Sequence, residues 1–465
     1  MVQPRALSEA ALPHLPPSVR VPGYRRRHRA PCVVHLGLGA FHRAHQATVF
    51  DALLRAGDDR WGVFGVAMRS PALADALNAQ DGLYSVRVEG GDAPWQVVGS
   101  VWSACVAAND PAVVHGAIAA ATTRWLTLTV TEKGYGPALA ATIVHGLAER
   151  HRAARPGLTV ASCDNLSGNG TLLKALCMDA AADPALRAWI DATCAFPNSM
   201  VDRIVPAATD RLRQQAHEAL GVRDEAAIAS EPFCEWVLQD HFAEPGDAAV
   251  LRCAGVTVVD DVRPFEEAKL RLLNASHTAI ACIGVVHGLR TVRECMARPA
   301  IAAFVHGLMT QEVMPHLHRP NLPAYRDALL ARFESPAIEH KVQQIATDSS
   351  KKIPQRWVPS VLDRLRCGAA LDHLSFAAAA WMRWCTGVND DGQTYALIDP
   401  MSKQLQAASA DHSLLDLDAI WGPELTANAV WRGAVEQSLA RIRQHGLARA
   451  LDEFVAGRAL DAERR

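Results

Sequence analysis

Three side chains suited to proton transfer and hydrogen bonding occur close together in the segment 266–277, namely Lys269, Asn274 and His277. At about 100° per residue in an α-helix, Asn274 lies about 140° around from Lys269, and His277 lies about 80° around, between them. The spacing predicts one helical surface that presents an amine, an amide and an imidazole. The structural alternative is an amphipathic helix with a solvated lysine and a packed histidine.

Lysine is scarce in this chain, and this makes Lys269 a candidate for chemistry. The 465 residues include seven lysines, and arginine supplies most of the positive charge. A partly desolvated lysine can lose its proton near neutral pH, whereas arginine stays protonated. Lys269 is therefore a candidate general base.

Composition narrows the class of protein. A formal net charge of −2 gives no electrostatic basis for binding nucleic acid. The start of the chain lacks the apolar core of a signal peptide, and the apolar run 278–289 is too short to cross a bilayer. The eleven cysteines include no CxxC pair, and no Cys/His cluster has zinc spacing. We predict a cytoplasmic protein, a monomer or small homo-oligomer, with no nucleic-acid or membrane partner and no metal.

The chain divides into two patterns. The strand-like run 32–36, the turn Gly37-Leu38-Gly39 and the helix-like run 43–56 form the opening of a doubly wound dinucleotide fold. Further strand-like runs are 61–68, 96–102, 125–131 and 158–163, and helix-like runs between them include 110–121 and 137–150. After about residue 264 the patterns are almost all helical. We predict an α/β N-terminal Rossmann-type dinucleotide-binding domain over 1–262 and a mostly α-helical C-terminal domain over 263–465.

The glycine turn reads Gly37-x-Gly39-x-x-His42, with histidine at the place of the third glycine of the dinucleotide fingerprint. Gly37 permits the tight turn, and Gly39 lets backbone amides approach a pyrophosphate. An acid after the second strand would favour NAD, but Arg69 stands there and tolerates a 2′-phosphate. The residues predict a dinucleotide cofactor and leave NAD and NADP open.

Two other dehydrogenase chemistries are excluded by spacing. None of the five tyrosines is followed by lysine in a Tyr-x-x-x-Lys pattern, and no zinc ligand set is present. If the chain is a dehydrogenase, a lysine is the remaining base.

Five motifs together resemble the polyol-specific long-chain dehydrogenases, a family that includes mannitol 2-dehydrogenase and fructuronate reductase. The motifs are GLGAFHRAHQ at 37–46, TEKGY at 131–135, SCDNLSGNG at 162–170, FPNSMVDR at 196–203 and KLRLLNASH at 269–277. The resemblance extends from about residue 30 to about residue 440. It implies a zinc-independent, nicotinamide-dependent oxidoreductase that acts on a secondary alcohol between a Rossmann-type and an α-helical domain.

The resemblance also implies roles for single residues. It makes Lys269 the general base, has Asn165 and Asn274 donate hydrogen bonds to the developing alkoxide, and has His277 hold a substrate oxygen. A carboxylate, Glu266, relays the proton to solvent. Two further residues, Asp202 and Lys352, hold substrate hydroxyls. The predicted cofactor-binding residues are Gly37, Gly39, Phe41, Arg69, Thr131, Glu132 and Asn165.

The substrate is predicted from the segment 342–356. Gln344 stands where mannitol dehydrogenases tend to have arginine, and the sequence from Lys352 to Arg356 resembles fructuronate reductase. A sugar acid carries a carboxylate, for which the guanidinium of Arg356 is the candidate partner; an arginine on the helix surface is the alternative. The leading prediction is interconversion of D-mannonate and D-fructuronate. Mannitol with fructose, or another polyol, is second, and a catalytically silent nucleotide-binding regulator is a remote third.

Overall fold

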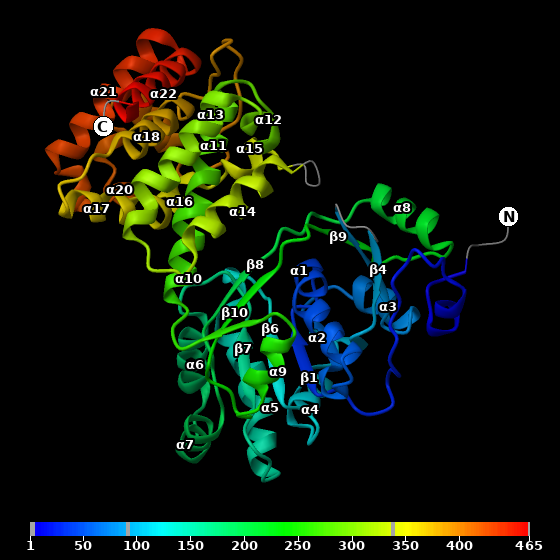
Figure 1. Ribbon diagram of the computed structural model, residues 1–465. Helices are drawn as coiled ribbons and strands as arrows, with labels where there is room; N and C mark the ends of the chain where they lie inside the picture. The colour runs from blue at the N-terminus through cyan, green and yellow to red at the C-terminus, as the bar shows by residue number, and fades with distance from the viewer. Residues whose placement is uncertain (1–4, 90–93, 336–339, 464–465) are drawn as a thin grey trace. The chain divides into compact units, whose positions relative to one another are not determined.

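The computed structural model describes residues 5–89, 94–335 and 340–463. It separates into two compact units, Met1–Arg263 and Pro264–Arg465. The first unit combines strands and helices, and the second is built from helices (Figure 1). The predicted fold class, a Rossmann-type α/β domain followed by a mostly helical domain, is confirmed.

The first unit is organised by a five-stranded parallel sheet with the strand order β5-β2-β1-β6-β7. Its strands are β1 (Val33–Leu36), β2 (Val63–Ala67), β5 (Val101–Val106), β6 (Trp125–Leu128) and β7 (Thr159–Ser162). The chain passes from β1 outward to β2 and β5, and later returns to add β6 on the other side of β1. This order is that of a doubly wound sheet, whose ligand site lies where the order reverses, between β1 and β6.

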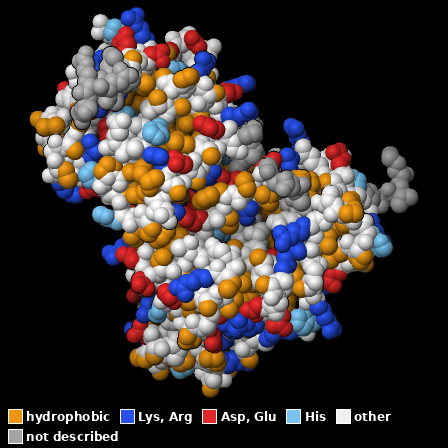
Figure 2. All heavy atoms as spheres, in the orientation of Figure 1, with side chains coloured by type: hydrophobic (Ala, Val, Ile, Leu, Met, Phe, Trp, Pro, Cys, Tyr) orange, Lys and Arg blue, Asp and Glu red, His pale blue; other side chains and the backbone are white. Residues whose placement is uncertain are grey.

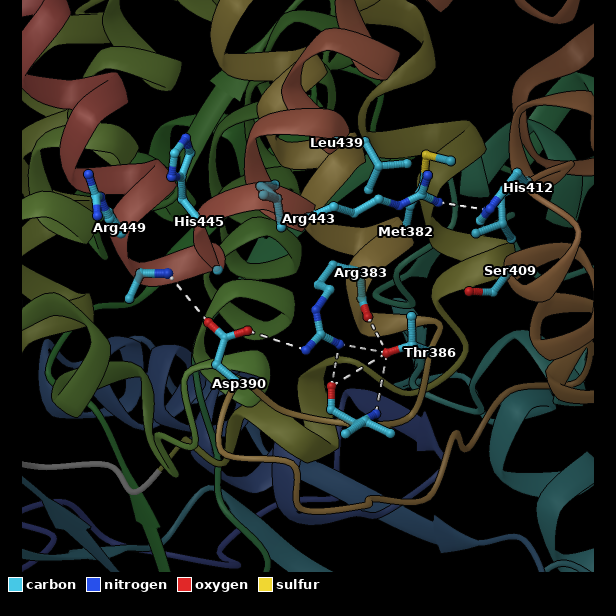
Figure 3. A pocket seen from close by; sticks show the side chains of 15 residues that line it. Met382, Arg383, Thr386, Asp390, Ser409, His412, Leu439, Arg443, His445 and Arg449 are labelled. Atoms are coloured by element: carbon cyan, nitrogen blue, oxygen red, sulfur yellow. Dashed lines mark hydrogen bonds and ion pairs between the residues drawn. The ribbon is translucent and has the colours of Figure 1, made fainter.

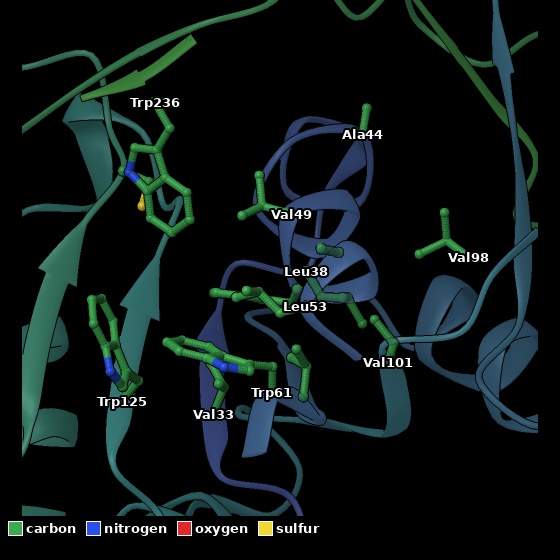
Figure 4. Packing of buried hydrophobic residues seen from close by; sticks show 14 of the residues in the cluster. Val33, Leu38, Ala44, Val49, Leu53, Trp61, Val98, Val101, Trp125 and Trp236 are labelled. Atoms are coloured by element: carbon green, nitrogen blue, oxygen red, sulfur yellow. The ribbon is translucent and has the colours of Figure 1, made fainter. Parts of the chain in front are cut away.

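Helices cover both faces of this sheet. Successive residues of a strand point to opposite sides, so apolar residues at successive positions must be buried on both faces. Val33 belongs to a core cluster that includes residues of α2, α3 and α9, and Val34 belongs to a second cluster with residues of α4, α5, α6 and α7. Figure 4 shows the first of these cores, in which Trp61, Trp125 and Trp236 are all almost fully buried. The helices are α2 (Gln46–Arg55), α3 (Ala72–Ala79), α4 (Pro111–Ala119), α5 (Pro137–Arg152), α6 (Asn169–Ala180), α7 (Pro184–Thr193) and α9 (Asp247–Cys253).

Two three-stranded sheets complete the first unit, in the orders β4-β3-β9 and β11-β10-β8. Their strands are β3 (Tyr84–Val88), β4 (Trp95–Val98), β8 (Ser199–Asp202), β9 (Ile228–Ser230), β10 (Glu235–Gln239) and β11 (Thr257–Val259). The strand-like run 96–102 is divided between β4 and β5. The division falls at Gly99, whose N–H donates to Asp51 Oδ1 (2.8 Å) and whose carbonyl accepts from Arg26 Nε (2.8 Å).

The remaining helices of the first unit are short or peripheral. They are η1 (Glu9–His14), α1 (Ala40–Ala44), η2 (Asp59–Trp61), η3 (Glu132–Gly134) and α8 (Asp210–Leu220).

The second unit surrounds α11 (Ala275–Val286), in which every residue from Thr278 to Val286 is buried. The helices before and around it are α10 (Arg263–Ala268), the π-helix η4 (Lys269–Asn274), α12 (Val292–Met296), α13 (Pro299–Gly307), the π-helix η5 (Leu308–Val313), η6 (Met314–His316) and α14 (Leu322–Glu334). The later helices are α15 (Val342–Ile345), α16 (Ser349–Arg356), α17 (Val358–Arg366), α18 (Asp372–Trp384), α19 (Ser402–Ala410), η7 (Leu414–Asp416), α20 (Asp418–Thr426), α21 (Ala429–His445) and α22 (Leu447–Glu463).

The surface is mixed in charge. Basic and acidic side chains are interspersed on the face seen in Figure 2, as expected for a formal net charge of −2. Within the described part of the chain, no helix combines the length and apolarity that crossing a membrane requires.

Glu312 is an internal cap in the second unit. Its carboxylate is almost fully buried in η5 and lies at the start of α18. There it accepts hydrogen bonds from the backbone N–H groups of His373 (2.6 Å) and Leu374 (3.0 Å), and the His373 ring contacts it at 3.0 Å. Negative charge at a helix N-terminus is stabilising, and these N–H groups have no partner within the helix itself.

Replacing Glu312 with alanine should lower the free energy of unfolding by about 3 kcal/mol, because three buried donors lose one shared acceptor. Urea unfolding followed by circular dichroism measures the change. A matched control is Glu334→Ala, since Glu334 is exposed at the end of α14 and its loss should cost less than about 0.5 kcal/mol. Equal unfolding midpoints for both variants would contradict the capping role.

Candidate functional site

The glycine turn after β1 is held by hydrogen bonds to both neighbouring strands, to Val66 in β2 and to Thr129 directly after β6. Gly37 has a φ of +93°, and a Cβ there would lie 2.1 Å from the carbonyl oxygen of Thr129. The Thr129 hydroxyl donates to the Gly37 carbonyl at 2.9 Å, and the Gly37 N–H donates to Val66 (2.9 Å). Conformation and space both require glycine at this position. Gly39, directly before α1, has only its own turn within contact of a Cβ, so the backbone there is open to a ligand.

Histidine at the third glycine position packs inward. The His42 ring is fully buried and stacks on His35 of β1, with ring centroids 3.4 Å apart. His35 is fixed in turn by the Thr127 hydroxyl (2.8 Å) and the Thr129 hydroxyl (3.0 Å). Burial lowers the pKa of His35 to about 3 and that of His42 well below its ordinary value. Both rings are therefore neutral, and they set the spacing between β1 and α1.

The helix expected over 43–56 is interrupted. The chain forms α1, breaks at His45 (φ −116°, ψ −91°), and resumes as α2 at Gln46. The His45 ring bonds the carbonyl of Glu235 (2.9 Å), and Phe41 stacks on it with centroids 5.0 Å apart. A tertiary contact to β10 thus overrides the continuous helical pattern.

The loop after β6 is strained and tied down by a carboxylate. Thr131 has a φ of +66°, which is unusual for a β-branched residue. Asp164 accepts hydrogen bonds from the N–H groups of Val130 (3.1 Å) and Thr131 (2.7 Å). Burial raises the pKa of Asp164, and the two N–H groups act against this shift. Sequence reasoning did not assign Asp164 a role, although it directly precedes Asn165 in the motif 162–170.

The predicted cofactor residues all follow carboxyl ends of the parallel strands. Gly37, Gly39 and Phe41 follow β1, and Arg69, with an exposed side chain, follows β2. The other three follow β6 or β7 and also have exposed side chains: Thr131, Glu132 and Asn165. Parallel strands end at one edge of their sheet, so the fold brings these residues to the edge where doubly wound folds bind ligands. Asp202 lies apart from them, buried at the end of β8 in another sheet.

In the second unit the segment 269–274 is a π-helix rather than an α-helix. After the turn, the N–H of Ala275 donates to the carbonyl of Leu270, five residues earlier. The expectation of 100° per residue across 266–277 is therefore wrong. An i→i+5 turn brings residues five apart closer to one face than an α-helix does, and Lys269 and Asn274 are five apart. Such turns are frequent at functional sites.

The helix α16 braces the end of this π-helix. Arg356 Nη1 donates to the carbonyl of Asn274 (3.0 Å) and to the hydroxyl of Thr278 (2.7 Å). The indole N–H of the next residue, Trp357, donates to the carbonyl of Ala275 at 3.1 Å. Burial lowers the pKa of Arg356 to about 10, so the group remains protonated at neutral pH. Arg356 is thus part-buried and bonded to the neighbouring helix, and its role as the partner of a substrate carboxylate stays a prediction.

The imidazole of His277 has an unused polar atom. Its Nε2 is buried and has no hydrogen-bond partner among the described residues. Burial lowers the pKa of His277 well below its ordinary value, and the nearby groups His340, Arg332, Arg356 and Lys352 lower it further. Phe333 packs on the ring with centroids 4.5 Å apart. A neutral ring in a positive environment is thus ready to exchange a hydrogen bond with a ligand oxygen.

Lys352 is half-buried and hydrogen-bonded to the backbone, whereas Gln344 is exposed. Lys352 Nζ donates to the carbonyls of Ile345 (3.0 Å) and Thr347 (2.5 Å), and burial lowers its pKa. Among the described residues two of its three donors are used, so a third can donate to a ligand. The side chain of Gln344, on α15, is exposed.

The structure brings Asn274, His277, Lys352 and Arg356 together in the second unit. It adds three neighbours of His277 that sequence reasoning missed: Arg332, Phe333 and His340. They follow no motif and come from a distant segment of the chain, so no local signal identified them. Glu266, in α10, is buried, and Lys269, at the start of the π-helix, is half-buried.

The described residues contain no group of three or more His, Cys, Asp or Glu side chains arranged to hold a metal ion. The polar groups at hand are therefore an amine, amides, imidazoles and guanidinium groups, which transfer protons and stabilise an oxyanion.

Comparison with known proteins agrees with this geometry. The family model for the mannitol dehydrogenase Rossmann domain matches residues 31–248, and the model for the mannitol dehydrogenase C-terminal domain matches residues 261–443. The D-mannonate oxidoreductase of Escherichia coli (strain K12) is 36% identical over 458 residues, which cover 89% of this chain and 93% of that protein.

Two solved structures are similar over almost their whole length. Mannitol 2-dehydrogenase of Pseudomonas fluorescens, in a ternary complex with NAD and D-mannitol, has a TM-score of 0.82 and 30% identity, covering 97% of this chain and 99% of that chain. A substrate-free D-sorbitol dehydrogenase has a TM-score of 0.89 and 28% identity, covering 96% and 100%. Both domain models and these relatives lead to one conclusion: the chain belongs to the mannitol dehydrogenase family and is an oxidoreductase that acts on CH–OH groups of a polyol or sugar acid.

Proposed function

We propose that this protein is a zinc-independent, NAD-dependent oxidoreductase that interconverts D-mannonate and D-fructuronate. The observation that carries the choice of a sugar acid is the environment of His277. A neutral imidazole with an unused Nε2 lies among cationic groups, of which Lys352 and Arg356 are two. A substrate that offers hydroxyls to the ring and a carboxylate to the cations complements this arrangement. The 36% identity to a D-mannonate oxidoreductase supports the same substrate.

Mannitol with fructose is the second candidate. It is favoured by the structural similarity to a mannitol 2-dehydrogenase that binds NAD and D-mannitol. A neutral polyol would use the same hydroxyl-binding groups and leave the positive charge of Arg356 without a partner.

NAD is the proposed cofactor, and the turn at Gly37 and Gly39 would hold its pyrophosphate. The residues fit such a group, because Gly37 is fixed in a conformation that only glycine adopts easily and the backbone at Gly39 is open. A bound nicotinamide supplies the hydride acceptor. Because Arg69 is exposed and tolerates a 2′-phosphate, NADP belongs in the same test.

The chemical step begins with the substrate hydroxyl. Lys269, as a neutral amine, takes the hydroxyl proton while hydride leaves the carbinol carbon, and Glu266 passes this proton toward solvent. The Asn274 amide donates to the oxygen as negative charge develops, and His277 holds an oxygen of the substrate. The roles implied for Asn165 and Asp202, in the first unit, stay predictions.

The test of the proposed function is an assay of reduced nicotinamide absorbance with both cofactors against D-mannonate, mannitol, arabinitol and sorbitol. We expect D-mannonate with NAD to give the highest kcat/KM. Oxidation of mannitol but not of D-mannonate would replace the leading candidate by the second.

Replacing Lys269 with alanine should lower kcat by about 10²–10⁴-fold, which is the contribution of a positioned general base. The dissociation constant of NADH, measured by fluorescence, should stay within about twofold, because the change lies outside the glycine turn. The control is Lys351→Ala, which removes an exposed amine from the surface of α16. Ordinary turnover by the Lys269 variant would overturn the assignment of the base.

Replacing Arg356 with alanine tests two roles of its guanidinium. One is the hydrogen bond to the Asn274 carbonyl, and the other is the positive charge offered to a substrate carboxylate. Loss of the brace on Asn274 should lower kcat for a sugar acid and for a neutral polyol alike. Loss of the charge should raise KM about tenfold or more for the sugar acid alone, as expected for a hydrogen bond to a charged group. Arg366→Ala, on the exposed end of α17, is the control. An equal change in KM for both substrates would leave Arg356 as a brace only.

A further inference from the structure

A cavity of about 710 Å³ opens in the second unit, away from the residues discussed so far (Figure 3). It is formed by the end of α18 with the segment that follows, the turn after α19, the last turns of α21 and the start of α22. Its size is within the range of pockets that bind small molecules.

The floor of the cavity is apolar. Met382, Leu414, Leu439 and Ile442 line it, and each side chain is at least nine-tenths buried. Such a floor favours a ligand with an apolar body, because contact removes apolar surface of the ligand from water.

The rim of the cavity is basic. Arg443 Nη2 bonds His412 Nδ1 at 2.8 Å. Since a guanidinium only donates, Nδ1 must accept, and the His412 ring then carries its proton on Nε2 as a further donor. Within the described residues, Arg443 contacts no carboxylate. Arg449 lies on the other side of the cavity and pairs with Glu453 at 2.8 Å (Figure 3).

The one acidic residue among the described lining residues, Asp390, is already engaged. Its carboxylate accepts from the backbone N–H of Leu447 (2.9 Å) and lies 3.3 Å from Arg383 Nη2. Arg383 is engaged as well, because it also donates to Thr386 (2.7 Å) and to the carbonyl of Val388 (2.5 Å). These two charges compensate each other inside the fold, so beside Met382 and Leu439 the charge offered to a ligand is that of Arg443 (Figure 3).

The cavity lies at the opposite end of α11 from the proposed catalytic residues. The N–H of Asp390 donates to the carbonyl of Val286, the last residue of α11 (2.8 Å), whereas Asn274 directly precedes its first residue. Twelve residues at 1.5 Å each separate the two ends by about 18 Å. The cavity is therefore not a part of the proposed substrate site.

We propose that this cavity binds a small organic oxyanion. The apolar body of the ligand lies on Met382 and Leu439, and its phosphate or carboxylate group is held by the Arg443 guanidinium and the Nε2–H of His412 (Figure 3). A guanidinium presents a planar pair of N–H donors that matches either group, so the anion is fixed by charge and by geometry.

Isothermal titration calorimetry with phenyl phosphate, benzoate and benzyl alcohol tests the proposal on the full chain. The three probes share an aromatic body and differ in charge, so the anions should bind and benzyl alcohol should bind at least tenfold more weakly. The stronger of phenyl phosphate and benzoate identifies the anionic group. Equal binding of benzyl alcohol would overturn the proposal.

Variants then locate the binding. The double variant Arg443→Gln/His412→Phe should weaken binding of the preferred anion by tenfold or more, whereas Arg441→Gln, an exposed arginine of α21 outside the cavity, should leave it unchanged. Turnover of the double variant should equal that of the parent chain, which reports an intact fold. An anion affinity that the double variant retains would place binding elsewhere and overturn the proposal.

Discussion

The candidate site of the second unit depends on one π-turn within a continuous helix. Between α10 and α11 the chain takes an additional residue into a turn, and this brings Lys269 and Asn274 toward a common face. A π-turn has poorer geometry than an α-turn and needs support from its surroundings. That support comes from the end of α16 and the residue after it, because Arg356 and Trp357 donate hydrogen bonds to the backbone carbonyls of Asn274 and Ala275. The placement of Lys269 and Asn274 thus depends on the hydrogen bonds that the end of α16 makes to the π-turn.

Local patterns were sufficient for four of the five strands in the parallel sheet of the first unit. The strand at 33–36, the turn at Gly37 and the runs near 63, 125 and 159 were all recognisable, because buried parallel strands are short apolar runs next to glycine turns. The break of the helix at His45 was not, since it is produced by a contact with Glu235, far away in sequence. Propensity alone describes neighbours along the chain, and here a distant partner decided the outcome.

The same limit applies to the candidate site. Lys269, Asn274 and His277 were found because they lie within nine residues of one another and match a family motif. The groups that define their surroundings were missed or misread: His340 and Arg332 follow no motif, and a regular helix was assumed where a π-turn exists. A single sequence shows which groups are available for chemistry, whereas burial and electrostatic environment depend on segments that only the folded chain brings together.

The stacked rings of His35 in β1 and His42 in α1 fix the distance between strand and helix, and this limits which substitutions either position can accept. A third glycine in the dinucleotide fingerprint allows close packing of helix on strand, but here an imidazole fills that space. Restoring glycine at position 42 alone would leave an empty volume against His35, and enlarging either ring would push the helix away from the sheet. The two positions are therefore expected to vary together in evolution, so that a substitution acceptable at one depends on the residue at the other.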